Sequence, residues 1–120
     1  MFDHVGFNVA DFARSKAFYL AALAPLGHKL FMEGEDFAII GGPTGRLWIG
    51  VRGPAASPIH IAFRAERRGD VEAFHRAALA AGGRDNGGPG LRAHYTPTYY
   101  AAFVFDPDGH NVEAVTHSPE

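Results

Sequence analysis

Alternation of apolar and polar residues marks two segments of the chain, residues 3–10 and 58–64, as strands. The bulky positions are Val5, Phe7, Val9, Ile59, Ile61 and Phe63. The intervening positions are His4, Gly6, Asn8, His60, Ala62 and Arg64. Because successive residues of a strand point to opposite faces, we expect the bulky faces to pack under helices and the other faces to border open space. His4 and His60 both lie on these open faces.

Each strand precedes an amphipathic helix. The first is predicted to begin after Asp11, a suitable N-cap, and carries an apolar stripe at three-and-four spacing from Ser15 to Leu26. The second is predicted to be capped by Asp70 and to bury Val71, Phe74, Ala78 and Ala81. Glycine or proline follows the last turn of each helix, as is typical of helix ends.

Further strand-like segments follow each helix. In the first half of the chain they are residues 28–32, 37–40 and 46–51. In the second half they are a weak segment at 84–86 and clear ones at 99–105 and 111–116. Turn residues at 43–45 and 106–109 join the last two strands of each half as hairpins.

The two halves also match in sequence. A shift of 56 positions places His4-Val5-Gly6-Phe7 on His60-Ile61-Ala62-Phe63, and matches Phe18 to Phe74 and Gly27 to Gly83. The prediction is therefore an α+β chain built from two β-α-β-β-β modules, residues 1–52 and 59–117, joined by a linker at 53–58 within one domain of residues 1–120. One sheet and one helix provide little core, so the modules must pair within a chain or between chains.

Composition narrows the class of protein. The 120 residues are 47% apolar and 20% charged, as in ordinary globular domains. A formal charge of −2 gives no electrostatic case for nucleic acid or an anionic membrane, and no apolar run is long enough to span a bilayer. The N-terminus lacks a signal-peptide pattern, so a cytoplasmic location is expected. The absence of cysteine excludes disulfides and thiolate ligands.

The repeat suggests a metal site. His4 and His60 occupy equivalent positions, and Glu113 interrupts an otherwise apolar last strand, where a charge needs a partner. Two imidazoles and one carboxylate suit a single divalent ion, namely Fe, Mn, Zn, Ni or Co, and leave coordination positions open. Aligning the turns through Gly45 and Gly109 places Ile49 opposite Glu113, and a shift of one residue places Trp48 there. Neither residue ligates metals, so three ligands are expected rather than four.

These residues resemble the glyoxalase/bleomycin-resistance/extradiol-dioxygenase superfamily, also called vicinal oxygen chelate proteins. The resemblance rests on four phrases, which are Asp3-His4-Val5-Gly6, residues 15–19 (SKAFY), residues 59–63 (IHIAF) and residues 105–115 (FDPDGHNVEAV). It implies a cup-shaped mixed sheet around a metal held by His4, His60 and Glu113, commonly in a homodimer. Glyoxalase I-like members carry a fourth, glutamate ligand where this chain has Trp48 or Ile49. That difference favours the three-ligand pattern of extradiol dioxygenases.

Other residues are candidates for the pocket. His94, Tyr95 and Tyr100 are candidate acids, bases or hydrogen-bond donors, although only one of Tyr99 and Tyr100 can face the cup. The substrate-binding candidates are Asn8, Arg64, Trp48 and Tyr99. Packing is the alternative role for the aromatic residues.

The leading hypothesis is a metal-dependent lyase, isomerase or dioxygenase whose small-molecule substrate chelates the metal through adjacent oxygens. The alternative is a drug- or metabolite-binding resistance protein of the same fold that performs no reaction. A third possibility, a thiol transferase like those that open fosfomycin, requires a basic lining for a phosphonate, and here only Arg64 and Arg92 are candidates.

Overall fold

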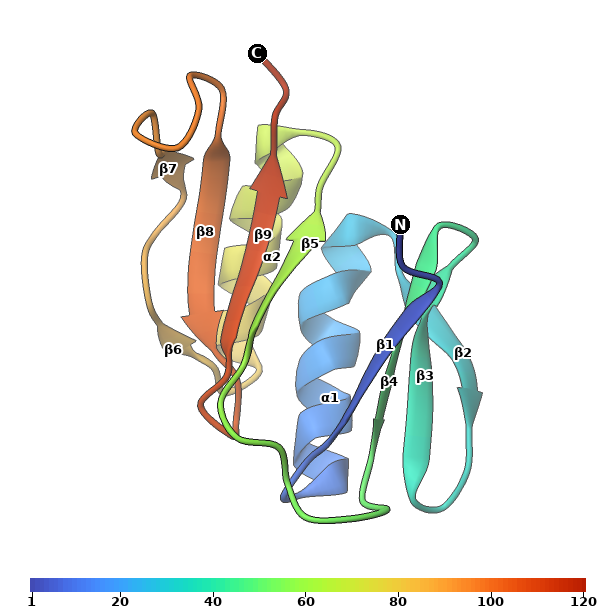
Figure 1. The fold of residues 1–120 in the computed structure, drawn as a ribbon. Helices are drawn as coiled ribbons and strands as arrows, with labels where there is room; N and C mark the ends of the chain where they lie inside the picture. Colours follow the sequence, from blue (N-terminus) through green and yellow to red (C-terminus); the bar gives the residue numbers. More distant parts are fainter.

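The computed structural model describes residues 1–120 and contains two sheets, each with one long helix on the same side (Figure 1). The first sheet has the strand order β1-β4-β3-β2, in which β1 is parallel to β4 and the other pairs are antiparallel. Its elements are β1 (His4–Asn8), α1 (Phe12–Leu23), the short 3₁₀ helix η1 (Ala24–Leu26), β2 (Lys29–Glu33), β3 (Phe37–Gly42) and β4 (Gly45–Gly50).

The second sheet repeats this arrangement in the order β5-β9-β8-β6, with β7 also paired to β8. Its β5 is parallel to β9, as β1 is to β4. Its elements are β5 (His60–Arg64), α2 (Arg68–Ala80), β6 (Arg84–Asp85), β7 (Gly90–Leu91), β8 (Tyr100–Phe105) and β9 (Asn111–Thr116). The predicted α+β fold with two β-α-β-β-β modules is confirmed, with β7 as an additional short strand.

The two helices begin differently, because α1 has a side-chain N-cap and α2 has none. α1 begins as predicted, because the Asp11 side chain accepts a hydrogen bond from the Arg14 backbone N–H at 3.2 Å. The predicted cap of α2 is wrong. That helix begins at Arg68 without a side-chain cap, and Asp70 lies in its first turn, 3.8 Å from the Arg67 guanidinium. An acid in the first turn still interacts favourably with the helix dipole.

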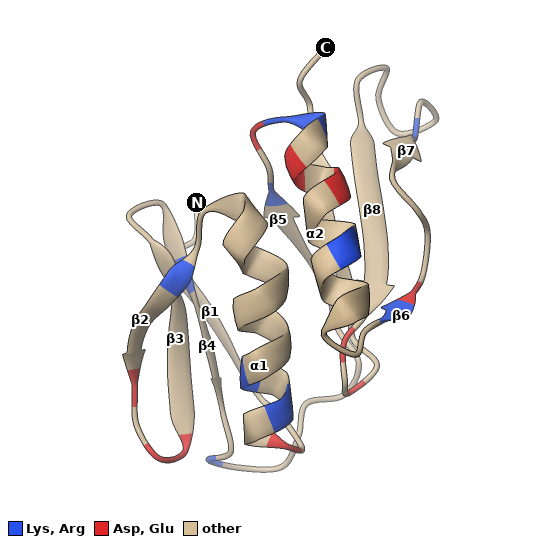
Figure 2. Ribbon diagram, turned by 180° about the vertical axis from the view of Figure 1, so that it is seen from behind, with Lys and Arg blue, Asp and Glu red and all other residues tan.

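The two helices lie side by side and share one core, as both views of the molecule show (Figures 1 and 2). The buried apolar cluster runs from Phe7 and Phe18 of the first module to Phe74 and Val112 of the second. Gly83, just after α2, allows close contact, since a Cβ atom there would lie 2.7 Å from the Phe18 ring. Neither helix is both long enough and apolar enough to cross a membrane.

The turn between β8 and β9 binds the second module to the first. The buried Asp106 carboxylate accepts a hydrogen bond from the Tyr19 hydroxyl of α1 at 2.6 Å. Asp108 accepts one from the Ala10 backbone N–H at 3.0 Å, and the buried His110 ring packs edge-on against Phe7 at 5.1 Å. We call residues 106–110 the clasp turn. It holds the two modules in one relative orientation.

Candidate metal and substrate site

His60 and Glu113 meet on the side of the second sheet that faces away from α2, which we call its open face. β5 and β9 are parallel, and Ala62 is the register partner of Glu113. The His60 Nε2 atom lies 3.1 Å from the Glu113 carboxylate. Glu113 is 1% exposed, whereas about half of the His60 side chain is exposed. A buried carboxylate and an accessible imidazole are therefore in contact on this face of the sheet.

The other ring nitrogen of His60 fixes which atom faces Glu113. His60 Nδ1 lies 3.0 Å from the Asn111 carbonyl oxygen, which can only accept, so Nδ1 carries the proton. In a neutral imidazole, Nε2 then presents a lone pair to a carboxylate oxygen. Two acceptors at this distance share either a proton or a metal ion.

Tyr99 completes the surroundings of Glu113 by donating a hydrogen bond from its hydroxyl to the second carboxylate oxygen. Burial, followed by the bond to Glu113, raises the pKa of Tyr99 to about 12. The phenol is therefore a protonated donor at neutral pH, and it leaves the other carboxylate oxygen to His60.

Aromatic rings extend outward from Tyr99. Tyr95 packs edge-on against it at 4.9 Å, and His94 lies 4.2 Å from Tyr95. His117 packs edge-on against Tyr99 at 5.3 Å. Sequence reasoning gave His117 no role, although in a strand ending at Thr116 it continues the face of Glu113.

The structure corrects the choice among the tyrosines. Tyr100 points towards α2, where its hydroxyl donates to Glu72 at 2.6 Å and its ring lies under Arg68. Alternation along the strand sends Tyr99 to the opposite face, towards Glu113. Tyr100, a catalytic candidate from the sequence, therefore lies on the helix side of the sheet, away from Glu113.

His4 lies apart from the His60–Glu113 pair. Its Nδ1 atom bonds the Asp3 carboxylate at 2.7 Å, and this bond lowers the pKa of Asp3. Nowhere in the chain do three or more histidine, aspartate or glutamate side chains converge as a metal would require. β1 and β5 run in opposite directions, and each histidine is the first residue of its strand (Figure 1).

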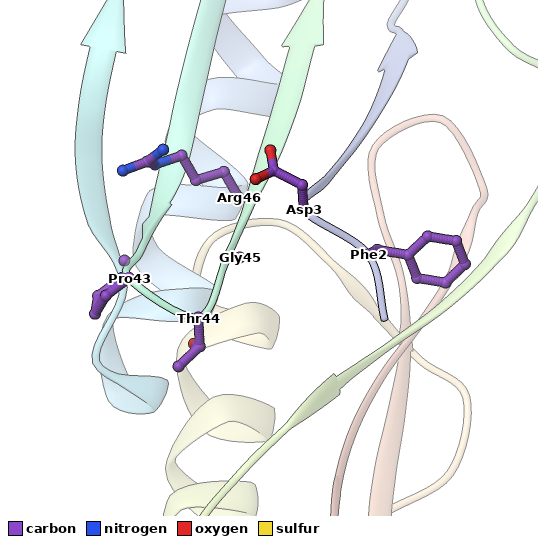
Figure 3. A pocket seen from close by; sticks show the side chains of 7 residues that line it. Phe2, Asp3, Pro43, Thr44, Gly45 and Arg46 are labelled. Atoms are coloured by element: carbon purple, nitrogen blue, oxygen red, sulfur yellow. The ribbon is translucent and has the colours of Figure 1, made fainter.

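Both histidines nevertheless line one cavity of about 690 Å³ between the modules. Each of β1 and β5 is paired on one side only, so the cavity is bordered by two free strand edges, with Leu23 and Leu26 among its other lining residues. A smaller polar pocket of about 160 Å³ adjoins it at Asp3 and Arg46 (Figure 3).

The register identifies the residue equivalent to Glu113. Glu113 pairs with Ala62, two residues after His60, and Trp48 pairs with Gly6, two residues after His4. Trp48, rather than Ile49, therefore occupies the fourth position. Ile49 is buried on the helix side. The alignment by turn glycines gave Ile49 because the second hairpin turn is longer than the first.

The remaining substrate-binding candidates, Arg64 and Asn8, differ in their surroundings. Arg64 is exposed on the open face of β5 and lines the larger cavity. Asn8 is already engaged, because its side-chain oxygen accepts from the Arg52 backbone N–H at 3.0 Å and its carbonyl accepts from the Ala56 N–H. Asn8 thus holds the connection to the second module.

A sequence profile described as the Glyoxalase/Bleomycin resistance protein/Dioxygenase superfamily matches residues 1–114. The chain belongs to this superfamily. A solved glyoxalase/bleomycin resistance protein from Albidiferax ferrireducens is 31% identical, with a TM-score of 0.85 over 97% of this chain and 98% of that one.

More distant superfamily structures show the fold alone. A glyoxalase-related enzyme from Fulvimarina pelagi is 16% identical, with a TM-score of 0.75 over 97% of this chain and 87% of that one. A lactoylglutathione lyase from Agrobacterium tumefaciens is 14% identical, with a TM-score of 0.71 over 97% and 92% of the two chains. No curated protein matches this chain.

Proposed function

We propose that this superfamily member is a metal-dependent enzyme whose small-molecule substrate chelates the metal through adjacent oxygens. His4, His60 and Glu113 would hold one divalent ion, Fe, Mn, Zn, Ni or Co. The observation that carries the proposal is the contact of 3.1 Å between the His60 Nε2 lone pair and a buried carboxylate, which calls for a cation.

The hydrogen bonds of the two histidines also suit metal ligation. His60 donates through Nδ1 to a backbone carbonyl, and His4 is bonded through Nδ1 to the Asp3 carboxylate. Metal-binding histidines usually make this kind of bond with the nitrogen that does not face the metal. In both rings Nε2 is thus the nitrogen that would face a metal, and in His60 it already lies beside Glu113. Glu113, buried and bonded by Tyr99, is fixed in place before a metal arrives.

A second copy of the chain would supply the missing histidine. Within one chain His4 belongs to the first sheet and does not join His60 and Glu113. A two-fold homodimer would contain two identical sites, each pairing His4 of one protomer with His60 and Glu113 of the other. The free edges of β1 and β5 leave backbone groups available for such an interface.

The surrounding residues suggest the chemistry. A bound divalent ion would act as a Lewis acid towards substrate oxygens. Tyr99 holds Glu113 in position and keeps its own proton at neutral pH. Tyr95 and His94, at the outer end of the aromatic cluster, would donate to a substrate. Trp48 in the fourth position offers no carboxylate base there, which favours three-ligand, dioxygenase-like chemistry over that of glyoxalase I.

Metal analysis tests the proposal. Protein prepared without a nickel column and loaded with Fe(II), Mn(II), Zn(II), Ni(II) or Co(II) should retain about one ion per chain. His60→Ala and Glu113→Gln should each lose it. His75→Ala is the matched control, because His75 is bonded to Asp85 beside α2 and β6, outside the site, and this variant should keep the ion. Less than about 0.2 ions per chain after every loading would overturn the metal site.

The alternative function, a binding protein without turnover, is favoured by one observation. An indole stands at the fourth position, where it offers a surface for a ligand rather than a bond to a metal. This function predicts ligand binding that neither metal loading nor Glu113→Gln changes. Oxygen uptake with catechols, or isomerisation of the methylglyoxal hemithioacetal, would instead favour the enzyme.

A further inference from the structure

The open face of the first sheet, which is the side away from α1, carries an uncovered group of aromatic and cationic side chains. Arg46 on β4 is the register partner of His4 on β1. Trp48, two residues further along β4, is the register partner of Gly6. Phe37 on β3 is the register partner of Gly50, which lies two residues after Trp48 on β4. We call Phe31, Phe37, Trp48, Arg46 and Arg52 the aromatic platform.

Glycines allow the indole of Trp48 to lie flat. A Cβ atom on Gly50 would lie 2.6 Å from the six-membered ring of Trp48, and one on Gly6 would lie 3.2 Å from the Trp48 Cβ. The ring therefore rests directly on the backbone of β4, and its other face points away from the sheet. Trp48 is half-buried, which is consistent with one covered and one accessible face.

Phe37 and Arg52 extend this surface. The Phe37 ring is within 12° of parallel to Trp48, with centroids 6.4 Å apart. The Arg52 guanidinium lies 4.8 Å from the Phe37 ring and 5.8 Å from the Trp48 ring, and Asp36 holds it at 3.3 Å. The charge of Arg52 is thus already balanced by a carboxylate.

Arg46 is the cation without such a partner. It forms no ion pair, and its guanidinium lies 3.8 Å above the Phe31 ring. Figure 3 shows its side chain extending from β4 across β3 towards β2 and away from Asp3. Asp3 instead bonds His4. An exposed arginine stacked on an aromatic ring keeps its hydrogen-bond donors free for an anion.

Part of the corresponding face of the second sheet, around Phe103, is covered by an arginine of its own chain. There the Arg92 guanidinium lies 5.3 Å from the Phe103 ring and donates to the carbonyls of Gly88 and Gly90 at 2.9 and 2.8 Å. The donors of Arg92 are thus used by carbonyls of its own loop, whereas those of Arg46 form no ion pair. In the aromatic platform a half-buried indole and a cation without an ion pair lie on the same face of one sheet.

We propose that the aromatic platform binds a planar aromatic carboxylate, with the ring stacked on Trp48 and the carboxylate paired to Arg46. This deepens the proposed function by naming a substrate class, and it rests on that function in placing the platform beside His4. Stacking, cation–π contact and a charge-assisted hydrogen bond each favour an anionic aromatic over a neutral or a saturated one.

The single tryptophan makes the test direct, since all indole fluorescence comes from Trp48. Metal-free protein is titrated with benzoate, benzyl alcohol and cyclohexanecarboxylate, which separate the contributions of ring and charge. Benzoate should quench the fluorescence and bind at least about tenfold more tightly than either comparison compound. Equal affinities for the three compounds, or no binding at millimolar concentrations, would overturn the proposal.

Variants then locate the two contacts. Arg46→Gln should abolish the preference for benzoate over benzyl alcohol, and Arg46→Lys should retain part of it. Trp48→Leu, followed by calorimetry because the fluorophore is lost, should weaken benzoate binding about tenfold. Arg76→Gln, an exposed site on α2, is the matched charge control and should change nothing. Unchanged benzoate binding by well-folded Arg46→Gln would contradict the assignment.

Metal-free conditions keep the two proposals separate. If the protein binds no metal, the benzoate titrations of the Arg46 and Trp48 variants still test the aromatic platform. If metal binds but benzoate does not, only the substrate class is wrong.

Discussion

At the scale of residues, hydrogen bonds to neighbouring groups set the chemistry of the site. His60 and His4 each bond through Nδ1, and Glu113 accepts from Tyr99. Sequence alternation could place the two histidines on open faces, and the apolar pattern of the last strand made Glu113 stand out. It could not tell which tyrosine faces Glu113, because that depends on the register between β8 and β9.

The state of Tyr99 can be measured. In metal-free protein, ultraviolet titration should show one phenol with a pKa of about 12, absent from Tyr99→Phe. Glu113→Gln should lower that pKa only part of the way towards 10.0, because burial is the larger cause of the shift. A wild-type titration identical to that of Tyr99→Phe would contradict the bond.

The raised pKa of Tyr99 also makes the free energy of unfolding depend on pH. The pKa of Tyr99 is raised in the folded protein, so the unfolded chain loses this proton first as the pH rises above 10.0. The contribution of Tyr99 to stability should therefore be complete below pH 10.0 and lost as the pH approaches about 12.

At the scale of elements, the clasp turn determines how the modules meet. Its sequence predicted only a hairpin turn. The structure adds that Asp106 accepts hydrogen bonds from the backbone N–H groups of Asp108 and His110 as well as from Tyr19. A local turn motif therefore also forms a buried contact between modules.

Substitution of Asp106 tests this role. Asp106→Ala leaves three donors without their acceptor and should lower the free energy of unfolding by about 3 kcal/mol, measured by urea denaturation. Tyr19→Phe should cost about 1–3 kcal/mol, since the buried carboxylate loses one partner. Asp108→Ala, which removes a less buried bond to Ala10, is the matched control and should cost about 1 kcal/mol. A smaller effect of Asp106→Ala than of Asp108→Ala would show that the buried Asp106 carboxylate is not the main stabilising contact of the clasp turn.

At the scale of the whole molecule, the shared core keeps the two helices together and points the open faces of the two sheets away from them (Figure 2). His4 and the His60–Glu113 pair then belong to different sheets of one chain. We therefore propose that a second chain completes the site.

Mixing variants tests this requirement. His4→Ala and His60→Ala should each fail to bind metal as homodimers, but a heterodimer of the two should contain one intact site and hold about half an ion per chain. His60→Ala mixed with Glu113→Gln is the matched control. Both changes affect the same module, so every site in that heterodimer is defective. Failure of the first mixture to bind metal, when wild-type dimers do, would exclude the shared site.

The sequence by itself determined the two-module fold and made three ligand-type residues candidates, because alternation, turn residues and the internal repeat are local patterns. Only the tertiary structure decided that Trp48 corresponds to Glu113, that Tyr99 bonds it, and that His4 lies on the other sheet. Those outcomes depend on strand register and on how the helices pack. Both are set by contacts between residues far apart in the chain.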